Sequence, residues 1–158
     1  MNRSRIGLGL VLGATLAACA PRLIPGTKIP DTDVNRALMG AVETYRQAVE
    51  RRDSAAILAM VSPNYFDVRG HPDDPTYHWN YERAKTDLPE KFAKVKDVRL
   101  EIQVRKIEVK EGFAKVSYLF TENFVAQLPA GQFPHHDSDV TQMEFQLIGK
   151  RWFIVRGL

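Results

Sequence analysis

The chain has 158 residues, of which 26% are charged, and a formal net charge of +3 at pH 7. This length suits one domain with a hydrophobic core, and its single cysteine excludes an internal disulfide. Basic residues alternate with acidic ones, as in VRLEIQVRKIEVKEG, instead of gathering on one face, which argues against nucleic-acid binding.

The first residues have the composition of an export signal. Arg3 and Arg5 precede an uncharged, mostly apolar stretch from Ile6 to Ala18. This stretch is shorter than the roughly 20 residues of a membrane-spanning helix. We therefore predict a signal peptide over residues 1–18, and its removal brings the net charge to about +1.

The end of this segment, Leu16-Ala17-Ala18-Cys19, resembles the lipobox of bacterial lipoproteins. The resemblance implies cleavage between Ala18 and Cys19, and a diacylglycerol thioether and an acylated amine on Cys19. Two or more acyl chains hold a protein firmly in a bilayer, so membrane lipid is the expected partner. Ala20 resembles the outer-membrane sorting position, which places the protein in the envelope, facing the periplasm.

Two other readings of Cys19 remain open. Ala18-Cys19-Ala20 also fits ordinary secretory cleavage, which would remove the cysteine. A buried helix with a core thiol is the other. Residues 19–30 would form a lipidated, Pro-rich tether, because APRLIPGTKIP is typical of an extended spacer, and residues 31–158 would form one domain.

The first part of this domain has helical spacing. Residues 31–53 predict a helix, capped by Asp31, Thr32 or Asp33, with one apolar face: Val34, Leu38, Val42, Tyr45 and Val49. A shorter helix follows, capped by Asp53 or Ser54 and ended by Pro63. We then expect a brief strand over 64–70, a loop over 71–80, and a helical stretch over 81–95 that Pro89 breaks or restarts.

From Val98 onward the apolar residues alternate, which predicts strands over 98–109, 113–126, 139–148 and 151–156, with a loop over 128–137. The alternation slips by one residue near Arg105 and Lys106, which predicts a β-bulge. The order of elements favours an α+β domain with N-terminal helices packed on a strongly bent antiparallel sheet.

Two segments, VERRDSAAILAMVSPNYFDVRG (49–70) and GKRWFIVRGL (149–158), resemble parts of the nuclear-transport-factor-2-like superfamily, also called cystatin-like, to which SnoaL-like proteins belong. The resemblance covers residues 31–158 and implies a cone whose open end can hold a ligand. Members include isomerases, dehydratases, cyclases and non-catalytic binding or dimerising modules, so the fold alone does not assign a function.

The resemblance to catalytic members makes Asp67, with Tyr65 nearby, the candidate pair for proton transfer. The alternative is that Asp67 only caps or pairs locally. We expect Glu122 and Glu144 to point outward from their strands, so that no acid–base site is visible in the sheet.

Aromatic residues at strand spacing, Tyr118, Phe120 and Trp152, are candidates for binding a ligand or for the core. The segments HHDSD (135–139) and HPDD (71–74) match no recognised ligand spacing, so we expect polar loop ends, no metal and no cofactor.

The predicted function is that of an envelope lipoprotein with a non-catalytic module for a small ligand or a protein. The first alternative is a proton-transfer enzyme of the isomerase, cyclase or dehydratase type that uses Asp67. The second is a structural module that forms a homodimer through its sheet, for which Leu119 on the polar face is a hint.

Overall fold

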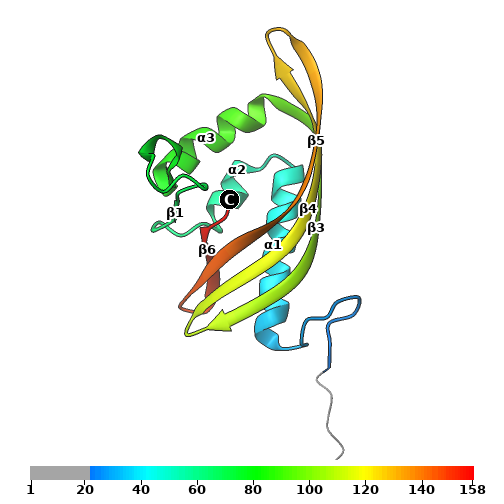
Figure 1. Ribbon diagram of the computed structural model, residues 1–158, viewed down its shortest axis with the longest axis vertical. Coiled ribbons are helices and arrows are strands. Elements are labelled where there is room, and N and C mark those ends of the chain that lie inside the picture. Colours follow the sequence, from blue (N-terminus) through cyan, green and yellow to red (C-terminus); the bar gives the residue numbers. More distant parts are fainter. Residues whose placement is uncertain (1–21) are drawn as a thin grey trace, which may run out of the picture.

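The computed structural model describes residues 22–158, in which helices lie against the concave face of a curled, four-stranded antiparallel sheet (Figure 1). The predicted α+β architecture is confirmed. The signal peptide (1–18) and Cys19 lie outside the described residues. Within the described part, no helix has both the length and the apolar character needed to cross a membrane.

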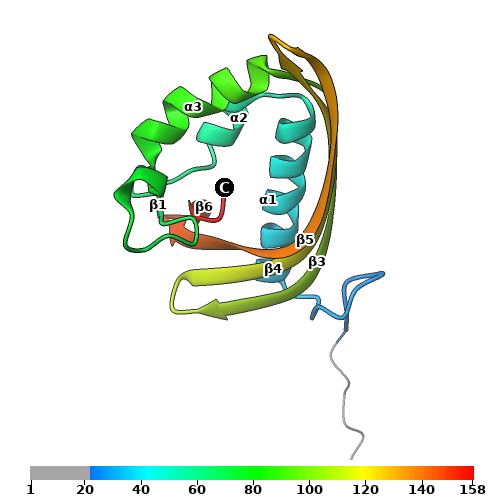
Figure 2. The same ribbon diagram turned by 45° about the horizontal axis from the view of Figure 1, so that its top comes forward.

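Helix α1 (Asp33–Glu50) lies across the hollow of the sheet (Figure 2). The Thr32 hydroxyl caps it by accepting the Asn35 N–H at 3.1 Å. Leu38 and Val42 are buried against the sheet as predicted, whereas Val34 in the first turn is 39% exposed.

Asp53 caps the start of helix α2 (Ser54–Leu58), and Asn80 caps the start of helix α3 (Tyr81–Ala93). Pro89 lies inside α3 and does not break it, so that prediction was wrong. Proline removes one helical hydrogen bond, but burial of Ala84 and Leu88 on the inner side of α3 holds the helix through that position.

A short strand, β1 (Phe66–Asp67), confirms the strand predicted in this region. Its antiparallel partner, β2 (Trp79–Asn80), and a 3₁₀ turn (Pro75–Tyr77) lie in the segment expected to be a loop. The two-residue strands are too short to show an alternating pattern, so the sequence carries little signal for β2.

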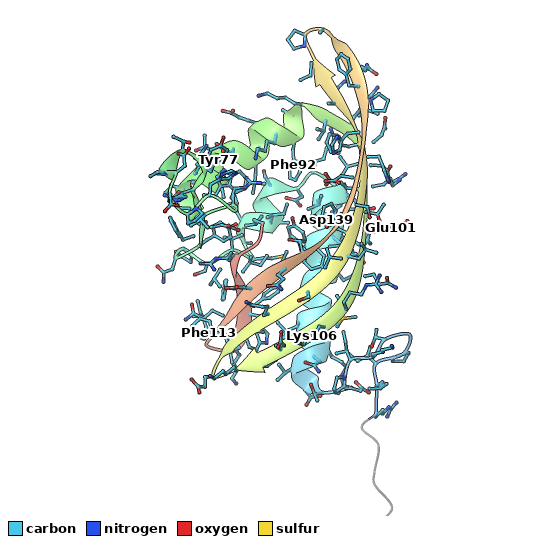
Figure 3. The ribbon with its side chains drawn as sticks, in the orientation of Figure 1. Tyr77, Phe92, Glu101, Lys106, Phe113 and Asp139 are labelled. Atoms are coloured by element: carbon cyan, nitrogen blue, oxygen red, sulfur yellow. The ribbon has the colours of Figure 1, made fainter. Side chains whose placement is uncertain are left out.

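The main sheet runs in the order β3 (Val95–Lys110), β4 (Phe113–Leu128), β5 (Gly131–Ile148) and β6 (Arg151–Arg156). The register between β3 and β4 shifts between Val104 and Lys106, which confirms the predicted bulge. In Figure 3, Glu101 projects from the convex side of this sheet and Phe113 marks its lower end.

The loop expected over 128–137 was wrong, because β5 begins at Gly131 and pairs with β4 from Gly131 to Gln146. β6 reaches only as far as Glu144 on β5, so Pro134 lies on an edge, where a strand tolerates proline. This correction turns His135 and Asp137 into strand residues with defined faces.

Residues 22–31 are also more ordered than an extended spacer. Leu23 pairs with Pro30, and the Ile24 N–H donates to the Ile29 carbonyl at 2.9 Å. Gly26, with φ at +76°, makes the turn, and Ile29 is buried. Burial of this isoleucine favours a closed hairpin over an extended strand.

A polar clamp joins the C-terminal end of α1 to β3. Glu50 accepts the Leu100 N–H at 3.1 Å and pairs with Arg46 at 2.7 Å. Arg46 in turn donates to the Leu100 carbonyl at 3.3 Å. The clamp fixes the helix against the strand where the concave face opens into a pocket.

Candidate functional site

A pocket of about 360 Å³ opens on the concave side of the sheet, between α1, β3, β4 and the C-terminal residues. Figure 2 shows the C-terminal end inside the space enclosed by the helices and the sheet. We call this space the cone pocket; it is lined by Tyr45, Val49, Asp67, Arg69, Leu100, Ile102, Tyr118, Phe120, Glu122, Thr141, Gly157 and Leu158.

The lining of the cone pocket combines apolar and polar side chains. Val49, Leu100 and Ile102 supply aliphatic surface, whereas Tyr45 and Tyr118 bring hydroxyl groups. Burial raises the pKa of Tyr118 to about 12 and also raises that of Tyr45, so both phenols stay protonated at neutral pH. Both side chains line the pocket, and no buried polar side-chain atom among residues 22–158 lacks a hydrogen-bond partner, so neither hydroxyl is a buried, unsatisfied group.

Glu122 faces inward, so the expectation that it points outward was wrong. It continues the even-numbered face of β4 on which Val116, Tyr118 and Phe120 are at least partly buried, because side chains two apart in a strand share a face. Burial raises the pKa of Glu122, while His135, whose Nε2 lies 3.6 Å away, opposes the shift. Glu144 lies on the convex face as expected, beside Lys115.

Asp67 lines the cone pocket, but its oxygens are already occupied. Oδ1 accepts the Arg69 N–H at 2.7 Å, and Oδ2 accepts the Gly157 N–H at 2.8 Å. The buried Tyr65 hydroxyl donates to Oδ2 at 3.4 Å and accepts the Leu158 N–H at 3.1 Å. The two predicted residues are therefore brought together, in a clasp that holds the C-terminal segment.

The clasp requires glycine at position 157. Its φ is +87°, and a β-carbon there would collide with the Gln142 carbonyl oxygen. The main chain can approach β5 closely only without a side chain, which places the Gly157 N–H within reach of Asp67.

Arg69 and Lys91 lie over the Trp79 ring, with the guanidinium carbon 4.4 Å and the ammonium nitrogen 4.1 Å from its centre. Burial and the nearby Arg69 lower the pKa of Lys91. Arg69 also lines the cone pocket, where it brings a positive charge.

The three aromatic residues proposed from the sequence lie in two different places. Tyr118 and Phe120 line the cone pocket, whereas Trp152 on β6 packs against the hydrophobic core. Tyr45, Arg69 and Glu122 also line the pocket, although the sequence did not indicate them as pocket residues. The signals for Tyr45 and Glu122 were present, since Tyr45 shares the apolar face of α1 and Glu122 shares the phase of Tyr118.

A larger hollow, of about 490 Å³, lies by the β3–β4 turn and includes Val109, Phe113 and Phe145. Of its charged residues, Glu108 and Lys110 are exposed, and Lys115 and Glu144 pair with each other at 3.2 Å. Because it offers no buried titratable group, the cone pocket is the better candidate for a functional site.

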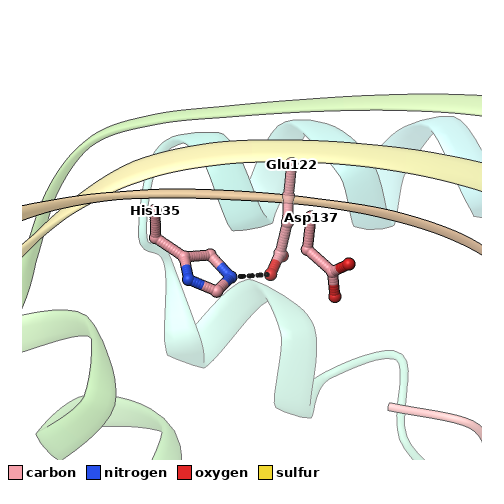
Figure 4. A group of neighbouring side chains, drawn as sticks. All are labelled: Glu122, His135 and Asp137. Atoms are coloured by element: carbon pink, nitrogen blue, oxygen red, sulfur yellow. Dashed lines mark ion pairs between the residues drawn. The ribbon is translucent and has the colours of Figure 1, made fainter.

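One group of side chains in the described part could share a metal ion: Glu122, His135 and Asp137, whose donor atoms lie within 4.8 Å of one another (Figure 4). The two stretches expected to be polar loop ends, HHDSD and HPDD, differ from each other in the structure. HHDSD is part of β5, whereas His71 of HPDD stacks on Tyr77 at 4.0 Å.

No protein-family model and no curated protein sequence matches the chain significantly. Solved structures do resemble it. A nuclear transport factor 2-like superfamily protein from Salmonella enterica serovar Typhimurium aligns with a TM-score of 0.64 at 15% identity, covering 78% of this chain and 87% of its own.

A ketosteroid isomerase-like protein from Erwinia carotovora atroseptica has a TM-score of 0.61 at 15% identity, covering 79% of this chain and 93% of its own. A Caulobacter vibrioides protein with a cystatin-like fold also has a TM-score of 0.61 at 15% identity, with 77% and 84% covered. At such identities the likeness establishes the fold alone, which is nuclear-transport-factor-2-like.

The clasp predicts that Asp67 contributes to stability. Asp67→Ala leaves the Arg69 and Gly157 N–H groups without an acceptor and should lower the free energy of unfolding by about 2 kcal/mol. Asp67→Asn keeps one acceptor oxygen and should lose about half as much. Urea denaturation of the full chain measures both.

The matched control is Asp73→Ala, an exposed aspartate in the 71–80 segment, which should change stability by less than about 0.5 kcal/mol. Equal stability of the Asp67→Ala variant and this control would show that Asp67 is not a structural acceptor.

Proposed function

We propose that the protein is an envelope lipoprotein whose cone pocket binds a small, partly apolar molecule without transforming it. One observation carries the proposal: aliphatic side chains and two tyrosine side chains line the same pocket. The volume of the cone pocket, about 360 Å³, falls in the range of small-molecule sites, which combine apolar walls with a few polar groups.

The lining groups define the ligand's chemistry. Val49, Leu100 and Ile102 suit an aliphatic or aromatic body, and the hydroxyls of Tyr45 and Tyr118 suit a carbonyl or hydroxyl oxygen. Arg69 at the rim suits an electron-rich group at the open end of the same molecule.

The proposed location rests on the sequence. A diacylglycerol thioether and an acylated amine on Cys19 would hold the chain in the outer membrane, facing the periplasm. The ordered turn over 22–31 begins soon after Cys19, so the domain would lie near the membrane surface.

Proton transfer is the second candidate, and Glu122 favours it instead of Asp67. Glu122 is partly buried in the cone pocket and burial raises its pKa, which suits a group that gives and takes a proton. One neighbour in fold is named ketosteroid isomerase-like, but that name describes the neighbour. Asp67, with its oxygens occupied, suits this role less well.

A homodimer through the sheet has less support. On the convex face, Leu119 pairs with Val140, which is 62% exposed. Their neighbours Gln103, Ser117 and Gln142 are polar, and a stable interface needs a larger apolar centre.

The pocket predicts a bound molecule that can be extracted. The full chain, purified from cell membranes in detergent and then denatured, should release one small molecule that mass spectrometry identifies. Val49→Trp fills the pocket from α1 and should abolish the release, whereas Val140→Trp on the convex face should leave it unchanged. Equal release from these two variants would place the ligand elsewhere.

Glu122→Gln separates binding from proton transfer in the same measurement. If the protein only binds, the variant should release the same molecule as the wild type. A different isomer or a dehydrated relative would indicate that Glu122 transfers a proton in the wild type.

If Cys19 carries the lipid anchor, association of the chain with membranes should depend on the sulfur atom of this residue. The wild-type chain should sediment with membranes, and Cys19→Ser, which lacks the thiol that accepts the diacylglycerol, should lose lipid labelling and mature processing. Labelling with radioactive palmitate measures this. A Cys19→Ser variant that still incorporates palmitate would contradict the anchor.

A further inference from the structure

We propose that Glu122, His135 and Asp137 bind a divalent transition-metal ion, with Zn²⁺ as the best fit, at the open end of the cone. The sequence predicts no metal here, because HHDSD (135–139) matches no recognised ligand spacing. The proposal does not depend on the cone pocket binding an organic ligand.

The strand register brings the three residues together. Glu122 on β4 lies directly opposite Asp137 on β5, and His135 lies opposite Phe124. Residues two apart in a strand share a face, so all three side chains project from the concave face. Figure 4 shows them on the same side of the two strands, with the His135 ring directed at Glu122.

The distances require little movement for an ion to bind. Metal–ligand bonds of about 2.1 Å in a tetrahedral site place the donor atoms about 3.4 Å apart. The His135 Nε2 and a Glu122 oxygen are 3.6 Å apart, and all three donors lie within 4.8 Å of one another. The His135 ring is stacked on Phe124 at 4.5 Å, which limits its rotation and keeps Nε2 near Glu122.

The charges also favour a cation. Carboxylates directly opposite each other on neighbouring strands repel, as Glu122 and Asp137 do here, and a divalent ion between them would neutralise both. The imidazole nitrogen favours zinc and other transition metals over Mg²⁺ and Ca²⁺, which prefer oxygen donors only.

Three protein ligands leave a coordination position open, which distinguishes such a site from a closed, four-ligand structural zinc. Glu122 belongs both to this group and to the cone pocket. The open position would therefore face the pocket, where water or a ligand oxygen can reach the ion.

Isothermal titration calorimetry with ZnCl₂ tests the proposal on the full chain, purified in detergent without a histidine tag and freed of metal with a chelator. The wild type should bind one ion, and His135→Ala should weaken binding by at least about tenfold. His136→Ala is the matched control, because this adjacent histidine points to the other face, where it contacts Asn123 at 2.8 Å. It should bind Zn²⁺ as tightly as the wild type.

Two aspartates on the same face of β5, Asp137 and Asp139, provide the second comparison. Asp137→Asn should weaken Zn²⁺ binding at least as much as His135→Ala, whereas Asp139→Asn, two residues farther along the same face, should not. Equal Zn²⁺ affinity of wild type and His135→Ala, or equal losses in His135→Ala and His136→Ala, would overturn the site. Preserved thermal unfolding of the metal-free variants confirms that their folds are intact, as expected for exposed positions.

Discussion

The structure depends on the alternation of one strand, β4, whose even-numbered side chains form the inner wall of the cone. Val116 and Tyr118 on this wall are buried in the core, and Phe120 and Glu122, farther along the same face, line the cone pocket. A strand cannot turn one side chain outward without a bulge, so the burial of Val116 also commits Glu122 to the concave face. A carboxylate enters the cone as a consequence of packing elsewhere in the strand.

Two groups of polar contacts hold the elements on either side of the cone pocket in place. The Arg46–Glu50 pair binds the main chain of Leu100 and fixes α1 on one side. The Asp67–Tyr65 clasp binds the main chain of Gly157 and Leu158 on the other. Each satisfies buried main-chain groups at the edge of the pocket, and so holds the surrounding elements without filling the space with side chains.

The sequence predicted the features that depend on local periodicity. The face of α1, the Asp53 cap, the brief strand at Phe66, and the bulge after Val104 are all present, because each follows from spacing within one segment. The wrong predictions concern features that depend on how strands pair with one another. Pro134 suggested a loop, but it lies on a free edge of β5, and the register with β4 then determines what His135 and Asp137 face. The pocket combines α1, β1, β3, β4 and the C-terminal residues, which no single segment reveals.

The ionisation of Glu122 tests the central claim most directly. Carbon-13 NMR of the side-chain carboxyls, recorded as the metal-free full chain is titrated with acid, should give Glu122 a pKa above the ordinary glutamate value of 4.5, because burial in the cone disfavours its charged form. Glu43, hydrogen-bonded to Arg46 on the helix surface, provides an internal contrast with a pKa of about 2. A Glu122 pKa at or below 4.5 would show that burial does not dominate its surroundings, and would contradict the account of the cone.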